Sequence, residues 1–214
     1  MNMDPKEISQ KVASVLLEVE AIKLSPSSPF TWSSGWKSPI YCDNRVSLAY
    51  PAARTFIKES LAAMIKANYP EVEAIAGVAT AGVPQGALVA DALGVPFMYV
   101  RSSPKGHGME NLIEGAPKGG QKVVVLEDLI STGGSSLKAV DALRKAGIQV
   151  LGMAAIFTYG FQIADDNFKA ADVSLSVLSN YGDMIETALA TAYVKAEDVE
   201  LLKAWRVDPA NWGA

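Results

Sequence analysis

Cysteine and histidine are almost missing from this chain of 214 residues, which holds one of each, Cys42 and His107. A single cysteine excludes an intramolecular disulfide and a cysteine-rich metal site, and a single histidine excludes a zinc centre with several histidine ligands. No apolar run reaches the roughly 18 residues that span a membrane. The first ten residues, MNMDPKEISQ, are polar, unlike a secretory signal. We therefore expect a cytoplasmic protein that has no membrane partner.

Positive charge is also scarce. The chain has 19 Lys and Arg against 23 Asp and Glu, a net charge of −4, and no basic run, so we expect no nucleic-acid partner. Two nucleotide-binding patterns are absent as well. There is no GxxxxGK[ST] sequence and no GxGxxG sequence after a predicted strand. These absences exclude a P-loop nucleoside triphosphatase and the usual dinucleotide-binding fold.

What the chain does have is hydrophobic sequence, at 50% of its residues, which is enough for one large α/β domain. Apolar spacing predicts helices and strands that alternate from Glu73 onward. Because the strands are apolar throughout, we expect both faces of a mainly parallel sheet to be covered by helices. The predicted strands are 74–78, 95–100, 123–127, 150–159 and 173–179. The predicted helices are 5–21, one from about 51, 84–93, 135–146, 184–190 and 196–205, and a short hairpin is expected around Phe30 to Gly35.

The most informative stretch is VVVLEDLISTGGSSL, from Val123 to Leu137. A buried strand leads into two carboxylates, Glu127 and Asp128, and then into a loop of hydroxyls and glycines before a helix. A helix N-terminus attracts anions, whereas two adjacent acids repel a bare phosphate. A sugar phosphate resolves this conflict, because it carries a phosphate together with hydroxyls that carboxylates bind. The alternative is an ordinary strand–turn–helix, but open α/β sheets place ligands at this end of their strands.

A long connection lies between Val100 and Lys122, and it contains five glycines and two prolines. Connections of this length inside a compact domain are usually functional or disordered. We expect a mobile lid over residues 101–121, carrying Arg101, Lys105 and His107. For His107 we favour a contact to an anion over general acid–base catalysis.

The segment of two acids, two residues and then S-T-G-G-S resembles the signature of type I phosphoribosyltransferases, which bind 5-phosphoribosyl-1-pyrophosphate (PRPP). The lid, with Arg101, Lys105, His107 and Gly108, resembles the R-x-x-x-K-x-H-G pattern of the orotate-using members. The segment from Phe30 to Arg45 resembles their F-x-x-x-S-G-x-x-S-P-x-Y-x-D-x-R stretch. The likeness extends from about Lys23 to Gly160.

The resemblance implies transfer of ribose 5-phosphate from PRPP to orotate, with Mg²⁺ held mainly by PRPP and no direct metal ligand from the protein. It implies a homodimer in which the lid acts across the interface. It also implies a single domain, with a helix and hood over about 1–45, a core over about 46–180 and C-terminal helices over about 181–214.

The same resemblance implies roles for individual residues. Asp128, Arg101, Lys105 and His107 are implied to be catalytic, the last three through the pyrophosphate. The implied PRPP contacts are Glu127, Asp128, Leu129, Ile130, Ser131, Thr132, Gly133, Gly134 and Ser135, and the implied orotate contacts are Lys23, Phe30 and Ser131.

Three departures from the family pattern predict a less basic site. Ser102 follows Arg101 where many members have a second basic residue, residues 77–84 lack a lysine, and Tyr159 stands where some members have an arginine that contacts orotate. Two other functions stay open: a non-catalytic sensor of PRPP or a nucleotide, and a phosphoribosyltransferase for another base. Two of the implied orotate contacts have an equally good structural interpretation. Lys23 can be a solvated charge at the end of a helix, and Phe30 can be an ordinary residue of the hydrophobic core. We interpret Trp32, Trp36, Trp205 and Trp212 as packing residues and Cys42 as structural.

Overall fold

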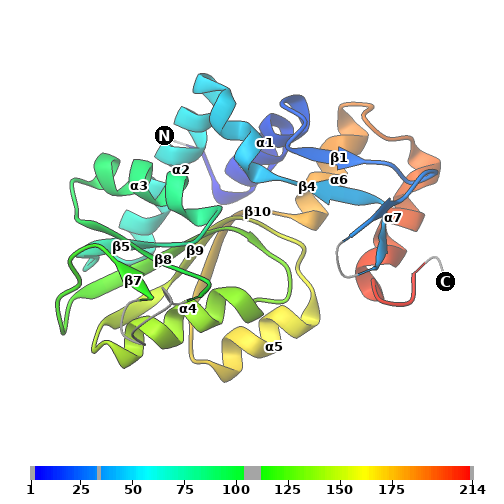
Figure 1. Ribbon diagram of the computed structural model, residues 1–214. Helices are drawn as coiled ribbons and strands as arrows, with labels where there is room; N and C mark the ends of the chain where they lie inside the picture. The colour runs from blue at the N-terminus through cyan, green and yellow to red at the C-terminus, as the bar shows by residue number, and fades with distance from the viewer. Residues whose placement is uncertain (1–2, 33–34, 104–111, 213–214) are drawn as a thin grey trace.

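The computed structural model describes residues 3–32, 35–103 and 112–212, and a six-stranded sheet lies at its centre (Figure 1). The strand order is β10-β9-β8-β5-β6-β7, and every pairing is parallel except that of β6 with β7. The predicted α/β class with a mainly parallel sheet is therefore confirmed. The strands are β5 (Ala74–Val78), β6 (Phe97–Val100), β7 (Ile113–Glu114), β8 (Lys122–Ile130), β9 (Gln149–Thr158) and β10 (Leu175–Asn180).

Helices cover both faces of this sheet (Figure 1). One layer is α1 (Pro5–Glu18), α2 (Pro51–Asn68) and α3 (Gly82–Leu93), and the other is α4 (Gly134–Lys145) and α5 (Gln162–Ala170). Successive residues of β8 pack against the two helix layers in turn, because side chains along a strand point to alternate faces of the sheet. Val124 and Leu126 join the core under α1 to α3, whereas Val123 and Val125 join the core over α4 and α5.

Four short strands form the hood beside the sheet: β1 (Ile22–Leu24), β2 (Phe30–Thr31), β3 (Lys37–Ser38) and β4 (Ile40–Cys42). β1 pairs with β4 and β2 with β3, both antiparallel, so the predicted short hairpin is present. A 3-10 helix, Asn44–Ala49, leads from the hood to α2.

The C-terminal helices complete the hood. These are α6 (Tyr181–Ala190), a 3-10 turn at Ala196–Asp198 and α7 (Val199–Val207), with α6 and α7 on the hood side of the molecule (Figure 1). The Trp205 indole of α7 donates a hydrogen bond to the Lys37 carbonyl (3.2 Å), and its ring centroid lies 5.6 Å from that of Trp32. The hood is thus built from both ends of the chain. Trp205 is fully buried, as its interpretation as a packing residue requires.

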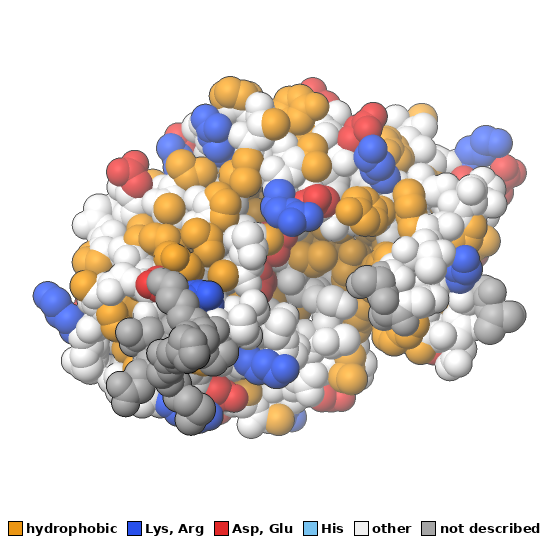
Figure 2. Space-filling view, in the orientation of Figure 1, with side chains coloured by type: hydrophobic (Ala, Val, Ile, Leu, Met, Phe, Trp, Pro, Cys, Tyr) orange, Lys and Arg blue, Asp and Glu red, His pale blue; other side chains and the backbone are white. Residues whose placement is uncertain are grey.

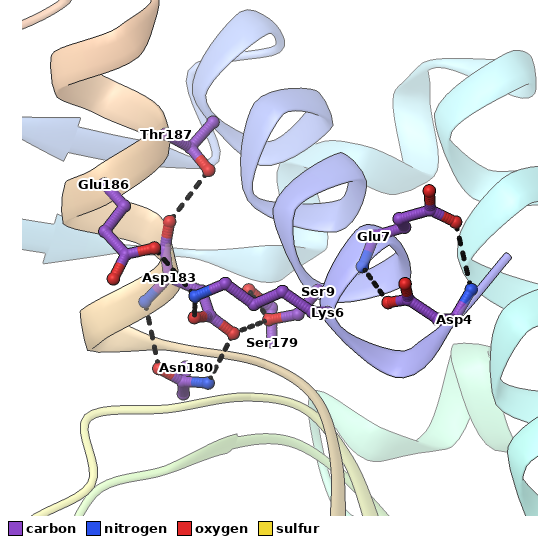
Figure 3. A network of polar contacts seen from close by, with 9 residues as sticks. All are labelled: Asp4, Lys6, Glu7, Ser9, Ser179, Asn180, Asp183, Glu186 and Thr187. Carbon is purple, nitrogen blue, oxygen red and sulfur yellow. Dashed lines mark hydrogen bonds and ion pairs between the residues drawn. The ribbon is translucent and has the colours of Figure 1, made fainter.

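α6 is also tied to α1 by side chains. Lys6 of α1 forms ion pairs with Asp183 and Glu186 of α6, and Ser9 donates a hydrogen bond to Asp183 (Figure 3). Within the described ranges, no helix is long and apolar enough to cross a membrane.

Three local predictions were wrong. β8 continues through Ile130, because Leu129 and Ile130 still pair with β9, so Asp128 lies inside the strand rather than after it. α5 forms where no helix was predicted. The prediction failed because the sequence of α5 is mostly polar and buries only Ala164 and Phe168, which is too few residues for an apolar period. β7 lies within the predicted lid, where it pairs with β6.

Candidate active site

Glu127 and Asp128 lie near the carboxyl end of the central strand β8, where side chains from two other elements hold them. The Ser136 hydroxyl of α4 donates to Glu127 Oε2 (3.1 Å), and the Asp128 amide donates to Glu127 Oε1 (3.1 Å). The Asn44 amide nitrogen donates to the Asp128 carbonyl (2.8 Å), and Asn44 is fully buried. The acid pair is therefore fixed from the helix side and from the segment that leaves the hood.

The charges of the two acids are poorly compensated. Burial, with the neighbouring Asp128 charge as the second cause, raises the pKa of Glu127 to about 8. Burial also raises the pKa of Asp128. Among the described residues, no Lys or Arg forms an ion pair with either carboxylate, and Arg45 is engaged by Asp43 through contacts of 2.7 and 2.8 Å. Such a pair suits a ligand that donates hydrogen bonds or develops positive charge.

The loop after β8 carries the predicted phosphate site. Its Gly133 has φ +79°, and a Cβ there would lie 2.7 Å from the Phe168 ring, so both the backbone conformation and the space favour glycine. The Asn167 side chain of α5 donates to the Thr132 carbonyl (2.9 Å). α4 begins at Gly134 with no acidic residue in its first turn. Its first amide groups lack partners within the helix and can bind an anion.

The start of α3 lies against β8 next to the acids. A Cβ on Gly82 would come 2.4 Å from the Leu126 carbonyl oxygen, so only glycine permits this approach. The turn before α3 contains a cis peptide between Ala79 and Thr80. This turn therefore lies near the carboxylates, as expected of a loop at the same edge of the sheet.

A cavity of about 620 Å³ lies between the hood and the loop after β8. Figure 2 shows the molecule hollowed on this face, with hydrophobic side chains in the hollow. All nine lining residues are uncharged, and five of them carry a hydroxyl group. They are Thr31, Trp32, Trp36, Tyr41, Cys42, Leu129, Ser131, Thr132 and Tyr159. The cavity thus has the size and chemistry of a site for a flat ring with polar substituents.

Lys23 and Phe30, the other predicted orotate contacts, lie around Tyr41. Lys23 is opposite Tyr41 in the β1–β4 pairing, and its ammonium pairs with Glu20 at 2.8 Å. The Phe30 and Tyr41 ring centroids are 5.8 Å apart. Neither Lys23 nor Phe30 lines the cavity, whereas Ser131 does.

A second cavity of about 420 Å³ brings Arg101 together with Ser135 at the start of α4. The sequence interpretation missed Lys138 and Lys145, which line the same cavity. Their seven-residue spacing on a helix, two turns, is a signal that could have indicated them. Arg101 lies 3.5 Å from Glu114 of β7. Lys105 and His107 lie outside the described residues.

The chain is similar to known phosphoribosyltransferases. Residues 49–191 match the model of the phosphoribosyl transferase domain family. Orotate phosphoribosyltransferase of Porphyromonas gingivalis is 59% identical over 208 residues, which cover 97% of this chain and 99% of that protein. Orotate phosphoribosyltransferase of Enterococcus faecalis is 53% identical, with coverage of 97% and 99%.

A solved structure agrees with these relatives. The crystal structure of orotate phosphoribosyltransferase from Aeropyrum pernix superimposes with a TM-score of 0.75 at 29% identity, over 86% of this chain and 99% of that one. The similarity therefore extends beyond the matched domain to nearly the whole length of both chains.

Proposed function

The chain belongs to the orotate phosphoribosyltransferases of the phosphoribosyltransferase family, and from this premise we propose which of its residues perform the reaction. The enzyme transfers ribose 5-phosphate from PRPP to orotate and releases pyrophosphate, which gives orotidine 5′-monophosphate for pyrimidine synthesis. One observation carries the assignment of residues: a helix N-terminus with free amide groups follows the buried Glu127 and the half-buried Asp128, and neither carboxylate forms an ion pair with a Lys or Arg among the described residues.

The 5′-phosphate binds to the loop from Ser131 to Ser135. Here the first amide groups of α4 and the hydroxyls of the loop donate hydrogen bonds, and the positive end of the helix dipole favours the negative charge. Gly133 and the Asn167–Thr132 contact fix the loop in this conformation before the ligand arrives. Leu129 and Ile130 contribute backbone at the end of β8.

Glu127 and Asp128 accept hydrogen bonds from the ribose hydroxyls. As the bond between the sugar carbon and pyrophosphate breaks, positive charge develops on the ribose ring, and the Asp128 carboxylate stabilises it. Preorganised charge of this kind is typically worth about 10² to 10³ in rate. Ser136 and Asn44 hold the two acids in place, so little reorganisation is needed during the reaction.

The pyrophosphate is neutralised by Arg101, Lys105 and His107, which also exclude water. Of these three, Arg101 lines the cavity that contains Ser135, so the described part of the chain brings one predicted pyrophosphate contact next to the phosphate loop. Arg101 exchanges its Glu114 partner for the pyrophosphate when PRPP binds.

Mg²⁺ fits this site as a partner of the substrate. The described residues contain no group of three or more His, Cys, Asp and Glu that could hold a metal by itself, but Mg²⁺ is commonly bound by one or two carboxylates together with substrate phosphates. The oxygens of PRPP would hold the ion, and Glu127 and Asp128 would lie beside it through the ribose hydroxyls that they bind. When bound, it offsets the negative charge of the leaving group.

Orotate occupies the cavity between the hood and the phosphate loop, where Ser131 can reach it. Lys23 and Phe30 lie beside Tyr41 outside the cavity lining, so their proposed contacts, the ammonium with the orotate carboxylate and the ring through apolar contact, require that orotate extend past Tyr41. We place the reaction in the cytoplasm, because a single cysteine is typical of proteins in reducing compartments.

One assay tests this function. Protein, Mg²⁺, PRPP and orotate are mixed, and the loss of orotate absorbance is followed. We expect turnover with orotate and none with uracil, adenine or hypoxanthine. Turnover with one of those bases alone would disprove the acceptor assignment, and tight PRPP binding without turnover of any base would favour a sensor.

We also propose a homodimer in which Lys105 of one chain serves the site of the other. Lys105→Ala and Asp128→Asn chains would each be nearly inactive alone. Mixed after separate purification, they should recover activity, because one of the two sites in a mixed dimer then has an intact lid and an intact acid pair. No recovery in dimers shown to have exchanged subunits would place Lys105 in its own chain's site.

A further inference from the structure

Tyr159 follows β9, lines the 620 Å³ cavity and is packed among other aromatic rings. Its ring centroid lies 5.3 Å from Trp32, 5.4 Å from Phe161, 5.6 Å from Trp205 and 5.8 Å from Phe157. Only 2% of the residue is exposed. Packing on this scale leaves the ring no room to turn, so the position of its hydroxyl is fixed.

The Tyr159 hydroxyl has no hydrogen-bond partner among residues 3–32, 35–103 and 112–212, although buried polar groups are nearly always paired. The hydroxyl oxygen is not fully enclosed by protein atoms. Because Tyr159 lines the cavity, this oxygen is the point at which the side chain meets it. Tyr181 provides the contrast. Its ring is equally buried and lies 5.4 Å from Trp205, but its hydroxyl donates to the Leu202 carbonyl at 3.0 Å.

The cavity around this hydroxyl offers a ligand neutral groups only. Burial raises the pKa of Tyr159 well above its ordinary value, so the phenol keeps its proton and can donate it in a hydrogen bond. Orotate presents two ring carbonyl oxygens and a carboxylate, all of which are acceptors. A fixed, unpaired donor in the cavity that adjoins the phosphate loop is complementary to such a ring.

We propose that the Tyr159 hydroxyl donates a hydrogen bond to an oxygen of orotate and is a specificity-determining residue for this acceptor. The inference rests on the proposed function, because it places orotate in this cavity. A site that must pair a buried donor discriminates against a base that lacks the matching acceptor.

Tyr159→Phe and Tyr181→Phe form a matched pair for the test, since each removes one hydroxyl from a tyrosine packed on Trp205. In Tyr159→Phe we expect the KM for orotate to rise about tenfold, the loss of one hydrogen bond to a ligand, with the KM for PRPP and the melting temperature unchanged. In Tyr181→Phe we expect the reverse: a lower melting temperature, because the bond to Leu202 is lost, and an unchanged KM for orotate.

The inference is overturned if Tyr159→Phe leaves the KM for orotate within twofold of wild type, or if the KM values for orotate and PRPP rise together. It is equally overturned if Tyr159→Phe lowers the melting temperature as Tyr181→Phe does, because the hydroxyl then has a partner in the protein. Failure of the wild-type enzyme to convert orotate would instead contradict the proposed function.

Discussion

Two pairs of carboxylates in this molecule differ in what surrounds them. Glu127 and Asp128 lie on the central strand, where the described residues provide only neutral donors. Asp183 and Glu186 lie on α6, where Lys6 pairs with both (Figure 3). Burial raises the pKa of Glu127 to about 8. Burial also acts to raise the pKa of Asp183, but hydrogen bonds from neighbouring side chains outweigh it, and the net shift is downward.

The difference shows how similar residues serve structure in one place and chemistry in another. The α6 pair is complete, since Asp183 also accepts hydrogen bonds from Ser9 and Asn180 and joins α1 to α6 (Figure 3). The β8 pair is incomplete without a ligand. An acid pair that forms no ion pair with the described residues carries a cost in stability, and perturbed pKa values of this kind cluster at functional sites.

The largest effect that separates the two pairs is expected for Asp128→Asn. Loss of the carboxylate removes the charge that stabilises the ribose ring in the transition state, so kcat should fall by about 10² to 10³ while PRPP affinity changes only a few-fold. Steady-state kinetics with orotate and direct titration of PRPP measure the two quantities.

Asp166→Asn is a suitable control, because Asp166 is exposed on α5 and contacts only Gln162 among the residues described. This control should keep wild-type kcat. Equal losses of kcat and PRPP affinity in Asp128→Asn would contradict the division of roles between the acids and the phosphate loop.

A second test uses pH. The folded-state pKa of Glu127, about 8, lies above its ordinary value of 4.5, so folding favours the protonated acid. Its contribution to stability is therefore complete below pH 4.5 and is lost as pH rises through 8. Glu127→Gln removes this loss, and we expect the variant to exceed wild type in free energy of unfolding by at least ~1 kcal/mol at pH 8.5.

Urea unfolding of both proteins at pH 5 and pH 8.5 measures this difference, and groups common to both proteins cancel in the comparison. At pH 5, only half a unit above the ordinary pKa of 4.5, most of this contribution is still present, so the difference between the two proteins should be much smaller than at pH 8.5. A wild type that is more stable than Glu127→Gln at pH 8.5 would show that the folded protein stabilises ionised Glu127, which would make the two carboxylate pairs alike.

The parts of the fold that were predictable have a regular pattern within one segment. Strands that are apolar on both faces and helices with an apolar side were located to within a few residues. α5 was missed because QIADDNFKA is mostly polar. β7 and the hood strands were missed or only outlined because strands of two or three residues have no measurable period.

The same distinction applies to the site. Residues 127–135 are contiguous, so their chemistry could be recognised as a motif. Asn44 and Asn167 were not predicted. Asn44 donates to a main-chain carbonyl 84 residues away and Asn167 to one 35 residues away, and every residue has a main-chain carbonyl, so the sequence does not indicate these partners. Tyr159 was noted only as a departure from a family pattern. Its fixed position comes from rings contributed by the hood and α7.

The smallest effect is expected in the compensated pair, from Asp183→Asn. The folded-state pKa of Asp183 is below its ordinary value of 3.8, so its contribution to stability is present above that pH and is lost as pH falls through the folded pKa. Because the Lys6 side chain is half exposed and water screens the pair, the lost attraction should be less than ~1 kcal/mol at pH 7. Thermal unfolding should show this deficit shrinking in high salt and below pH 3, with kcat unchanged, since the network joins α1 to α6 away from the reacting groups. A change in kcat comparable to that of Asp128→Asn would mean that the α6 pair is coupled to the active site, and the contrast between the two carboxylate pairs would then fail.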